Sequence, residues 1–297
     1  MKRRILFIVN PISGHHNKKA FPKKVLSCLD HSRYTDEITF TEYAGHAATL
    51  SQQAVNDGFD IIVAVGGDGT INEVSRAIIG TDVTMAIVPF GSGNGLARCL
   101  RLPLFQERAI AQINEFSTLR MDTALVNDCP FLSIAGVGLD AQTAYDFSKD
   151  PKRGFITYAK YALSNYLYRE PVKYKTCFDD QMTIECSPLL ITFANSNQFG
   201  YNAVIAPKSS LADGLLDACI LNRPPVPVSL HVANQLLLGQ IDRSRYFTET
   251  KFQKVVVERP AEDVVNIDGE PIMFPSRLEI KVVPQSLTMI CGTKNLK

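Results

Sequence analysis

The stretch from Asp60 to Val74 constrains the fold more than any other part of the chain. Its first half, Ile61–Val65, is a short apolar run rich in β-branched residues. Such a run is typical of a strand that is buried on both faces. Three glycines follow within four residues, and glycine lets backbone N–H groups approach a bulky anion closely: Gly66, Gly67 and Gly69.

A helix is expected directly after these glycines. Ile71, Val74 and Ile78 fall on one helical face. Thr70 and Glu73 have the spacing of a capping box, which predicts that the helix begins near Thr70. The predicted order is therefore a buried strand, a glycine turn and a capped helix.

This order directs unpaired backbone donors and the positive end of a helix dipole toward one point, which favours a phosphate there. A tight turn without any ligand is the alternative. Asp68 stands between the glycines. Because a carboxylate repels a phosphate unless a divalent cation is present, Asp68 favours a nucleotide site with Mg²⁺.

Composition bounds the remaining possibilities. With 45% apolar and 21% charged residues in 297, the chain has the composition of a soluble globular protein with room for two domains. The net charge of +1 predicts no nucleic-acid partner. Seven scattered cysteines without a CxxC pair indicate a reducing compartment, and no apolar run is long enough to span a bilayer. A cytoplasmic protein is expected.

The first half of the sequence alternates between strand and helix patterns. This alternation predicts a doubly wound parallel α/β domain. The loops after three of its strands would gather at one edge of the sheet, where ligands bind. The predicted strands are Ile5–Val9, Ile38–Glu42, Ile61–Val65 and Met85–Pro89, and the predicted helices are Ala20–Leu29, Ala47–Asp57, one from Thr70 and one from Leu96.

The second half is dominated by strand patterns separated by turn residues, which predicts an antiparallel β-rich domain. Two helices are expected within it, at Phe155–Arg169 and about Val228–Leu238. The predicted domains are residues 1–124, with 286–297 as a candidate completion, and 125–285. The predicted strands are Phe131–Ile134, Tyr174–Phe178, Leu189–Phe193, Leu215–Leu221, Val255–Val257, Val264–Ile267 and Leu278–Val283.

Four separated blocks resemble the family of diacylglycerol and sphingosine kinases. Gly66–Thr70 resembles a nucleotide signature that these lipid kinases share with NAD kinases and phosphofructokinases, and Asn10–Gly14 resembles the start of the lipid-kinase catalytic domain. Gly91–Arg98 resembles a lipid-kinase block, although its Gly93 stands where many diacylglycerol kinases carry Thr or Ala. The fourth block is Asp268–Glu270.

The resemblance implies that the first domain binds ATP. The residues that it assigns to the nucleotide are Asn10, Ser13, Gly14, Thr41, Gly66, Gly67, Asp68, Gly69, Thr70, Asn72, Glu73, Gly91, Ser92 and Asn94. His46, close to Thr41, is interpreted as a residue of the first turn of the next helix.

Asp213-Gly214 has two interpretations. It is a local Asp-Gly turn by itself. It also resembles the family's structural magnesium loop, whose ligands would be Ser210, Asp213 and Leu215. Oxygen ligands of this kind suit Mg²⁺.

Asp268-Gly269-Glu270 predicts a β-hairpin with an Asp-Gly turn. The resemblance implies a catalytic group of Glu270, Asp68 and Asp268, with Glu270 as the base on the acceptor hydroxyl in a cleft between the domains. Asp68 and Asp122 would hold the catalytic Mg²⁺.

The expected function is ATP-dependent phosphorylation of a lipid hydroxyl. A kinase of NAD or a sugar phosphate, and a non-catalytic sensor of nucleotide or lipid, are the alternatives. Phe155, Tyr158, Ala162 and Tyr166 share a helical stripe that favours core packing over a membrane face. Basic residues between Lys149 and Lys175, among them Lys152 and Arg153, are candidates for peripheral contact with an anionic membrane. A homodimer is left open.

Overall fold

The computed structural model describes residues 2–14, 18–151 and 154–292, without the side chains of Lys19 and Phe155. Unit 1 comprises the described residues up to Met121 and from Gln285 onward, and unit 2 comprises Asp122–Pro284. The sequence predicted domains of 1–124, with 286–297, and 125–285. The candidate membrane contacts Lys152 and Arg153, and the side chain of Phe155, lie outside the described residues.

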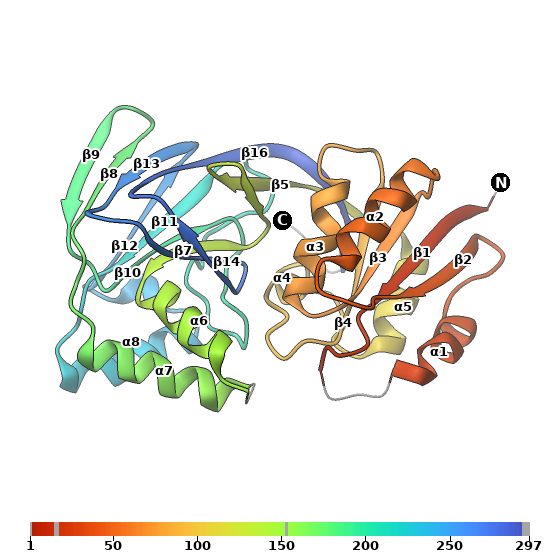
Figure 1. Cartoon of the computed structure of the whole chain (residues 1–297), viewed down its shortest axis with the longest axis horizontal. Helices are drawn as coiled ribbons and strands as arrows, with labels where there is room; N and C mark the ends of the chain where they lie inside the picture. Colours follow the sequence, from red (N-terminus) through yellow and green to blue (C-terminus); the bar gives the residue numbers. More distant parts are fainter. Residues whose placement is uncertain (1, 15–17, 152–153, 293–297) are drawn as a thin grey trace. The chain divides into compact units, whose positions relative to one another are not determined.

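Unit 1 is built on a parallel sheet, which Figure 1 shows between helices, and every residue of its two inner strands β3 and β4 is buried. The strand order is β2-β1-β3-β4, and the last residues of β16 pair with β4 in parallel. The chain therefore returns to unit 1 at its end. These strands are β1 (Arg3–Val9), β2 (Tyr34–Phe40), β3 (Ile61–Gly66), β4 (Thr84–Pro89) and β16 (Arg277–Ile290).

Helices cover both faces of this sheet (Figure 1). One face packs against Phe21 and Val25 of α1 and Ile110 of α5, while α2 packs with α3 on the other face. The helices are α1 (Phe21–Cys28), which follows the 3-10 turn Lys18–Ala20, α2 (His46–Asn56), α3 (Asp68–Ile78), α4 (Gly95–Cys99) and α5 (Gln106–Glu115).

The β-rich unit 2 contains two sets of strands. A six-stranded antiparallel sheet among the described residues has the order β12-β11-β10-β7-β14-β15. The members of this sheet are β7 (Ile134–Gly138), β10 (Leu190–Ala194), β11 (Leu216–Leu221), β12 (Phe247–Phe252), β14 (Asp263–Ile267) and β15 (Glu270–Phe274).

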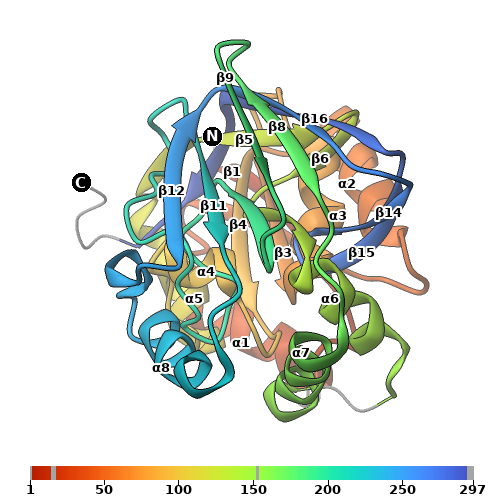
Figure 2. The same cartoon turned by 90° about the vertical axis from the view of Figure 1, so that its left-hand side faces the viewer.

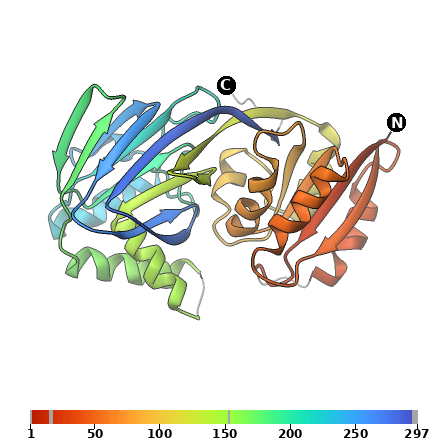
Figure 3. The ribbon, with the colours of Figure 1, turned by 45° about the horizontal axis from the view of Figure 1, so that its top comes forward.

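The second set is also antiparallel and includes β16, β13, β8 and β9 in that order. Strand β5 lies beside β16, and β6 pairs with β5. Figure 3 shows the green hairpin of β8 and β9 at the outer edge of these strands. Apolar side chains from both sets form one core that includes Phe193, Phe252 and Val255. The remaining strands are β5 (Thr118–Val126), β6 (Cys129–Phe131), β8 (Tyr174–Phe178), β9 (Met182–Cys186) and β13 (Lys254–Glu258).

Three helices belong to unit 2: α6 (Leu139–Lys149), α7 (Phe155–Tyr168) and α8 (Val226–Leu237), with a 3-10 turn at Ile241–Arg243. In Figure 2, α7 and α8 lie along the same side of this unit. Tyr166 is buried and Tyr158 is half-buried, so the predicted stripe of α7 packs into the protein. Helix α6, which the sequence did not predict, lies against α7.

The predicted fold class is confirmed: a parallel α/β unit is followed by an antiparallel β-rich unit. The strand predicted at Phe131–Ile134 is wrong, because β6 ends at Phe131 and β7 begins at Ile134. The backbone N–H groups of Leu132 and Ser133 are directed to a side chain, Asp268, and not to a strand. Among the described residues, no helix is both long and apolar enough to cross a bilayer.

Candidate active site

Three loops meet at the carboxyl ends of the parallel strands of unit 1. A Cβ atom on Gly14 would lie 2.1 Å from the carbonyl oxygen of Phe90, so the first loop packs directly on the third. A Cβ atom on Gly91 would lie 2.8 Å from the Cα atom of Gly67, so the second and third loops also touch through their backbones. The glycines therefore allow three loops to approach more closely than larger residues would permit.

Asp68 holds the second and third loops together. It is the first residue of α3, and its two carboxylate oxygens accept the backbone N–H groups of Asn94 and Gly95, each at 3.1 Å. Phe90 donates its N–H to the carbonyl of Gly66 at 2.7 Å, which fixes the same two loops at their strand ends. Asp68 thus organises the backbone of the glycine loops.

The first loop is fixed by side chains. The Asn10 amide donates to Thr70 Oγ1 at 3.0 Å, and the Ser13 hydroxyl donates to the Asn10 carbonyl at 3.2 Å. The ammonium of Lys18 donates to both Ser13 oxygens, with 2.8 Å to Oγ, and lies 5.0 Å from the centre of the Phe90 ring. Lys18 is buried, and this burial lowers its pKa to about 8.

Lys18 is a residue that the sequence analysis missed. Its only signal was a basic pair, Lys18-Lys19, a few residues after the first glycine loop. The ammonium of Lys18 and the uncapped N-terminus of α3 both place positive charge at this edge of the sheet. Such an edge can bind the phosphates of a nucleotide.

Asn94 supplies a second indication of a ligand. Its backbone is in the left-handed region at φ 51°, and its side-chain amide donates to the Gly91 carbonyl at 2.7 Å. The other amide atom, Oδ1, is buried and accepts no hydrogen bond within the described part of the chain. A buried acceptor beside the glycine loops fits a hydrogen-bond donor from a bound nucleotide.

Three of the predicted nucleotide residues lie nearby with partners of their own. Thr41 is buried directly after β2, and its N–H donates to Val9. Asn72 is buried in α3 and accepts a hydrogen bond from Arg76 at 2.9 Å. Glu73 accepts the N–H groups of Gly45 and Ala47 at 3.0 and 3.2 Å.

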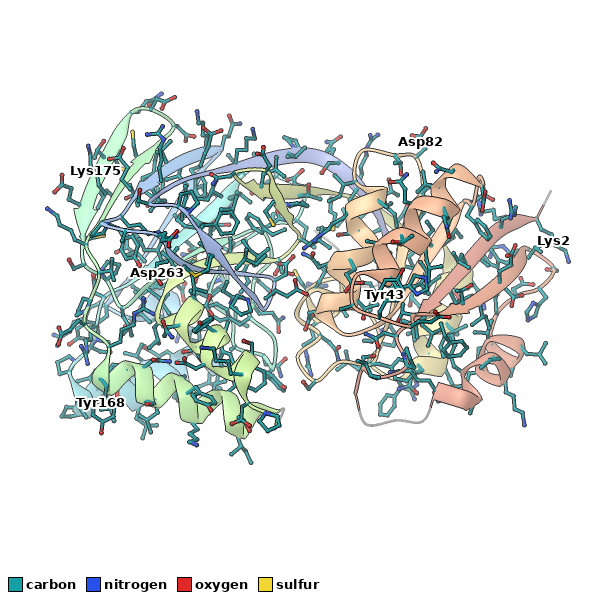
Figure 4. The ribbon with its side chains drawn as sticks, viewed as in Figure 1. Lys2, Tyr43, Asp82, Tyr168, Lys175 and Asp263 are labelled. Atoms are coloured by element: carbon teal, nitrogen blue, oxygen red, sulfur yellow. The ribbon has the colours of Figure 1, made fainter. Side chains whose placement is uncertain are left out.

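The predicted capping box is therefore wrong. Helix α3 begins at Asp68 and not at Thr70, and Glu73 caps the start of α2 instead of its own helix. His46 is the first residue of α2, as predicted, and its ring stacks on Tyr43 at 4.5 Å between centroids. Tyr43 itself is exposed. Figure 4 labels it together with Asp82, which lies in the loop before β4.

In unit 2 the structure places Asp122 against the loop that carries Asp213, although the sequence analysis had assigned these two carboxylates to different metal sites. Asp122 is fully buried, and one of its carboxylate oxygens accepts the N–H of Gly214 at 2.7 Å. Its own N–H donates to the carbonyl of Leu211 at 2.7 Å. Asp122 therefore supports the loop that carries Asp213.

The Asp213 carboxylate already has a cation beside it. Lys251 lies 2.8 Å from Asp213 and 3.4 Å from Asp217, and the other oxygen of Asp213 accepts the N–H of Leu215 at 3.2 Å. The hydroxyl of Ser210 accepts the N–H of Ala212 at 3.4 Å. Burial raises the pKa of the Asp217 carboxyl.

Among the described residues, no group of three or more His, Cys, Asp or Glu side chains is arranged to hold a metal ion. The ligand set predicted around Asp213 is of another kind, with one carboxylate and main-chain oxygens. It stays a prediction.

The predicted hairpin is confirmed. Strands β14 and β15 pair from Ile267 and Glu270 outward, and Asp268 and Gly269 both have positive φ, at 51° and 94°. The Asp268 carboxylate accepts three backbone N–H groups, those of Leu132, Ser133 and Ile134, at 2.8 to 3.0 Å. These contacts fix the Asp268 side chain against residues 132–134, and Glu270 is the half-buried carboxylate that follows the turn. The catalytic roles of both residues stay predictions.

A buried carboxyl group, that of Asp140, is linked to this hairpin through a side-chain amide. Asp140 of α6 accepts the Asn266 amide at 2.9 Å and the Tyr158 hydroxyl at 3.3 Å. The same Asn266 accepts the N–H of Gly269 at 2.9 Å, so one amide links Asp140 to the turn. Burial raises the pKa of the Asp140 carboxyl to about 6, against the opposing effect of these hydrogen bonds. The sequence offered no signal for this link beyond an Asp in an apolar segment.

Comparison with known proteins finds one family domain in each half of the chain. Residues 4–126 match the diacylglycerol kinase catalytic domain, and residues 133–291 match the YegS C-terminal NAD kinase beta sandwich-like domain. A Bacillus subtilis diacylglycerol kinase is 30% identical over 275 residues, which cover 90% of each chain. The chain belongs to the diacylglycerol kinase family of lipid kinases.

Other relatives of this lipid kinase carry similar names. A Pseudomonas putida protein named "Probable lipid kinase YegS-like" is 28% identical, with 92% of each chain covered. A solved diacylglycerol kinase structure from Bacillus anthracis has a TM-score of 0.76 at 21% identity, and covers 98% of this chain and 97% of its own. The structural likeness shows the shared fold.

Proposed function

We propose that this lipid kinase transfers the γ-phosphoryl group of ATP to the hydroxyl of a membrane-derived lipid, such as a diacylglycerol or a sphingoid base. The observation that carries the proposal is the direct backbone contact between Gly67 and Gly91, tied by the Asp68 carboxylate. It creates a close-packed set of backbone donors at the carboxyl edge of a parallel sheet, which is where α/β folds bind nucleotides.

The roles divide between the two units. The loops of unit 1, with Lys18, would bind the phosphates, and the unpartnered Asn94 Oδ1 would accept a hydrogen bond from the nucleotide. Glu270 would accept the proton of the lipid hydroxyl as its oxygen bonds to the γ-phosphorus. The bond to the β-phosphate oxygen breaks, and ADP leaves. Asp268 would hold the turn that presents Glu270.

Mg²⁺ would neutralise charge on the phosphates when it is bound. Asp68 is a candidate ligand, because its carboxylate lies at the start of α3 beside the glycine loops and carboxylate oxygens suit Mg²⁺. Asp122 is the second candidate ligand, although it also accepts the N–H of Gly214. Both assignments are part of the proposal.

Turnover with labelled ATP tests the function. Purified protein is incubated with Mg²⁺, labelled ATP and, in separate reactions, dispersed diacylglycerol, sphingosine, NAD and sugar phosphates. A labelled lipid product is expected. Asp68→Asn should remove nearly all turnover, because the amide cannot accept both N–H groups through two oxygens. The matched control is Asp82→Asn, at an exposed residue of the same unit.

Transfer to NAD or a sugar but to no lipid would overturn the acceptor class. Full lipid turnover in Asp68→Asn would overturn the assignment of the glycine loops. ATP binding without any transfer would favour a sensor.

We further propose that Ser210, Asp213 and Leu215 hold a structural cation in unit 2. Addition of Mg²⁺ should raise the thermal midpoint of the wild type and leave that of Asp213→Ala unchanged. An equal rise in both proteins would contradict the site. The contact between Asp213 and Lys251 makes a dependence on Mg²⁺ concentration informative, because the ion must compete with an ammonium group.

A further inference from the structure

Three strand ends of the six-stranded sheet lie at one edge of unit 2. Strands β10 and β14 both end where β7 begins, because β7 pairs with each of them there. Asn195 and Ser196 follow β10 directly, and the turn with Asp268 follows β14, with Glu270 next to it. This edge therefore carries two polar residues, Asn195 and Ser196, which we call the Asn-Ser pair.

The Asn-Ser pair is fixed against the same segment that Asp268 holds. The backbone N–H groups of Asn195 and Ser196 both donate to the carbonyl of Ser133, each at 2.9 Å. The N–H of Ser133 in turn donates to the Asp268 carboxylate at 2.8 Å. One residue, Ser133, thus joins the pair to the turn that precedes Glu270.

The orientation of the Asn195 amide is set by two backbone carbonyls. Its Nδ2 donates to the carbonyl of Leu132 at 2.7 Å and to that of Asp122 at 2.9 Å. Exchange of the amide nitrogen and oxygen would bring an oxygen against two carbonyl oxygens, which excludes it. The remaining atom, Oδ1, is buried and accepts no hydrogen bond within the described part of the chain. Asn195 therefore presents an acceptor that needs a donor.

Ser196 provides a second polar group of this kind. Its side chain is fully buried, and its hydroxyl has no hydrogen-bond partner among the residues that the structure describes. A buried polar group without a partner costs free energy, and native proteins contain few of them. Two in succession, beside the predicted base Glu270, indicate a ligand that brings its own polar group to this edge.

We propose that the Asn-Ser pair recognises a second polar group of the acceptor lipid, a hydroxyl or an amine next to the hydroxyl that is phosphorylated. Asn195 Oδ1 would accept a hydrogen bond from this group, and the Ser196 hydroxyl would make a second one. The preferred acceptors would be monoacylglycerols and sphingoid bases. A diacylglycerol carries an ester at this position, and an ester has no donor for Asn195 Oδ1. The inference rests on the proposed function, since it assigns both groups to one lipid.

Two lipids that differ in a single hydroxyl test the proposal. Monooctanoylglycerol carries a hydroxyl on its central carbon, and the monooctanoyl ester of trimethylene glycol lacks it. With the full chain, Mg²⁺ and labelled ATP, kcat/KM should be at least about tenfold higher for the glycerol ester, because the glycol ester leaves Asn195 Oδ1 unpaired. A short-chain sphinganine should share this advantage, and dioctanoylglycerol should resemble the glycol ester.

Variants of the pair test which residues carry the preference. Ser196→Ala removes the hydroxyl with little change in volume, so kcat/KM should fall severalfold for the glycerol ester and stay the same for the glycol ester. A purely structural role would lower both equally. Asn195→Ala should reduce the preference further. Its thermal midpoint shows whether it folds without its two carbonyl contacts, and if it does not, Ser196→Ala and the lipid comparison decide.

Thr192→Val is the matched control. Thr192 is another buried residue whose hydroxyl lacks a partner among the described residues, but it lies in the middle of β10 and not at its end. Its loss should leave the preference between the two esters unchanged.

Calorimetry of the two esters with the full chain, in the absence of ATP, measures the same preference without turnover. A binding preference for the glycerol ester with no transfer to any lipid would support the pair and overturn the proposed function. Transfer with equal kcat/KM for both esters would overturn the pair and support the function. A preference that persists in Ser196→Ala and in folded Asn195→Ala, or that Thr192→Val also abolishes, would likewise overturn the pair.

Discussion

Asp68 in unit 1 and Asp268 in unit 2 use the same device in different surroundings. Each precedes a glycine, and each carboxylate accepts backbone N–H groups from a distant segment: two from Asn94 and Gly95, and three from residues 132–134. Asp68 begins a helix beside loops whose glycine backbones touch. Asp268 occupies a hairpin turn that a side-chain amide links to the buried carboxyl of Asp140.

The difference shows that the predicted site residues of the two units are held in place by different kinds of interaction. In unit 1 the geometry depends on the absence of side chains in addition to Asp68, so the site should also be sensitive to added volume. In unit 2 it depends on hydrogen bonds to carboxylates, so the site should be sensitive to charge and protonation. Substitutions that change side-chain volume and preserve charge, or change charge and preserve volume, can test this difference between the two units.

The largest effect is expected from Glu270→Gln. The amide preserves the shape of the side chain and removes its basicity, and loss of a general base lowers kcat by about two to four orders of magnitude. The affinity for ATP should stay the same, because the nucleotide loops belong to unit 1. Steady-state kinetics with lipid and ATP measure both quantities.

Glu262→Gln is the matched control, at an exposed glutamate in the loop before β14. A Glu270→Gln enzyme that retains kcat within about threefold of the wild type would place the base elsewhere, since this loss is far below the range for a general base.

A smaller effect is expected from volume in unit 1. The Cβ of Gly91→Ala would lie 2.8 Å from both Gly67 Cα and Asn94 Oδ1, so the loops must separate. Overpacking of this kind costs about 1–3 kcal/mol, which corresponds to at least a severalfold loss of ATP affinity. Gly67→Ala, with a nearest approach of 3.2 Å, should lose less. Titration with ATP by calorimetry measures the series, and equal affinities in all three proteins would contradict the proposed close packing.

The smallest effect on turnover, and a distinctive effect on stability, is expected from Asp140→Asn. The pKa of Asp140 is raised from 3.8 to about 6 in the folded protein, which corresponds to about 3 kcal/mol. Between these values the folded state binds more protons than the unfolded state. This contribution to the free energy of unfolding is therefore fully present below about pH 4 and is lost as the pH rises through 6.

Denaturant unfolding from pH 4 to pH 7 measures this dependence. Asp140→Asn keeps an acceptor for Asn266 or Tyr158 and lacks the proton, so its stability should fall less than that of the wild type over this range. The neighbouring Tyr158 stays neutral there, because burial and Asp140 raise its pKa well above the ordinary value. Identical slopes for the two proteins would show that Asp140 is not the group responsible.

The sequence by itself determined the elements whose signals are local. Apolar runs that end in glycine or proline predicted β3 and β4 and the loops after them, because strand burial and turn conformation depend on adjacent residues. Strand β2 lacks such a run, and it covers Tyr34–Phe40 where Ile38–Glu42 was predicted. The Asp268-Gly269 turn was predictable for the same reason, since both residues must adopt positive φ. The fold class followed from the change between alternating and strand-only patterns.

Only the tertiary structure decided which groups these elements bring together. Glu73 has the local spacing of a cap for its own helix, yet it caps α2, because packing places the N–H groups of Gly45 and Ala47 within its reach. Lys18 became a buried cation, and Asp140 joined Asn266 from 126 residues away. Hydrogen-bond partners of this kind are selected by burial, since a polar group removed from water must find whichever partner the fold supplies.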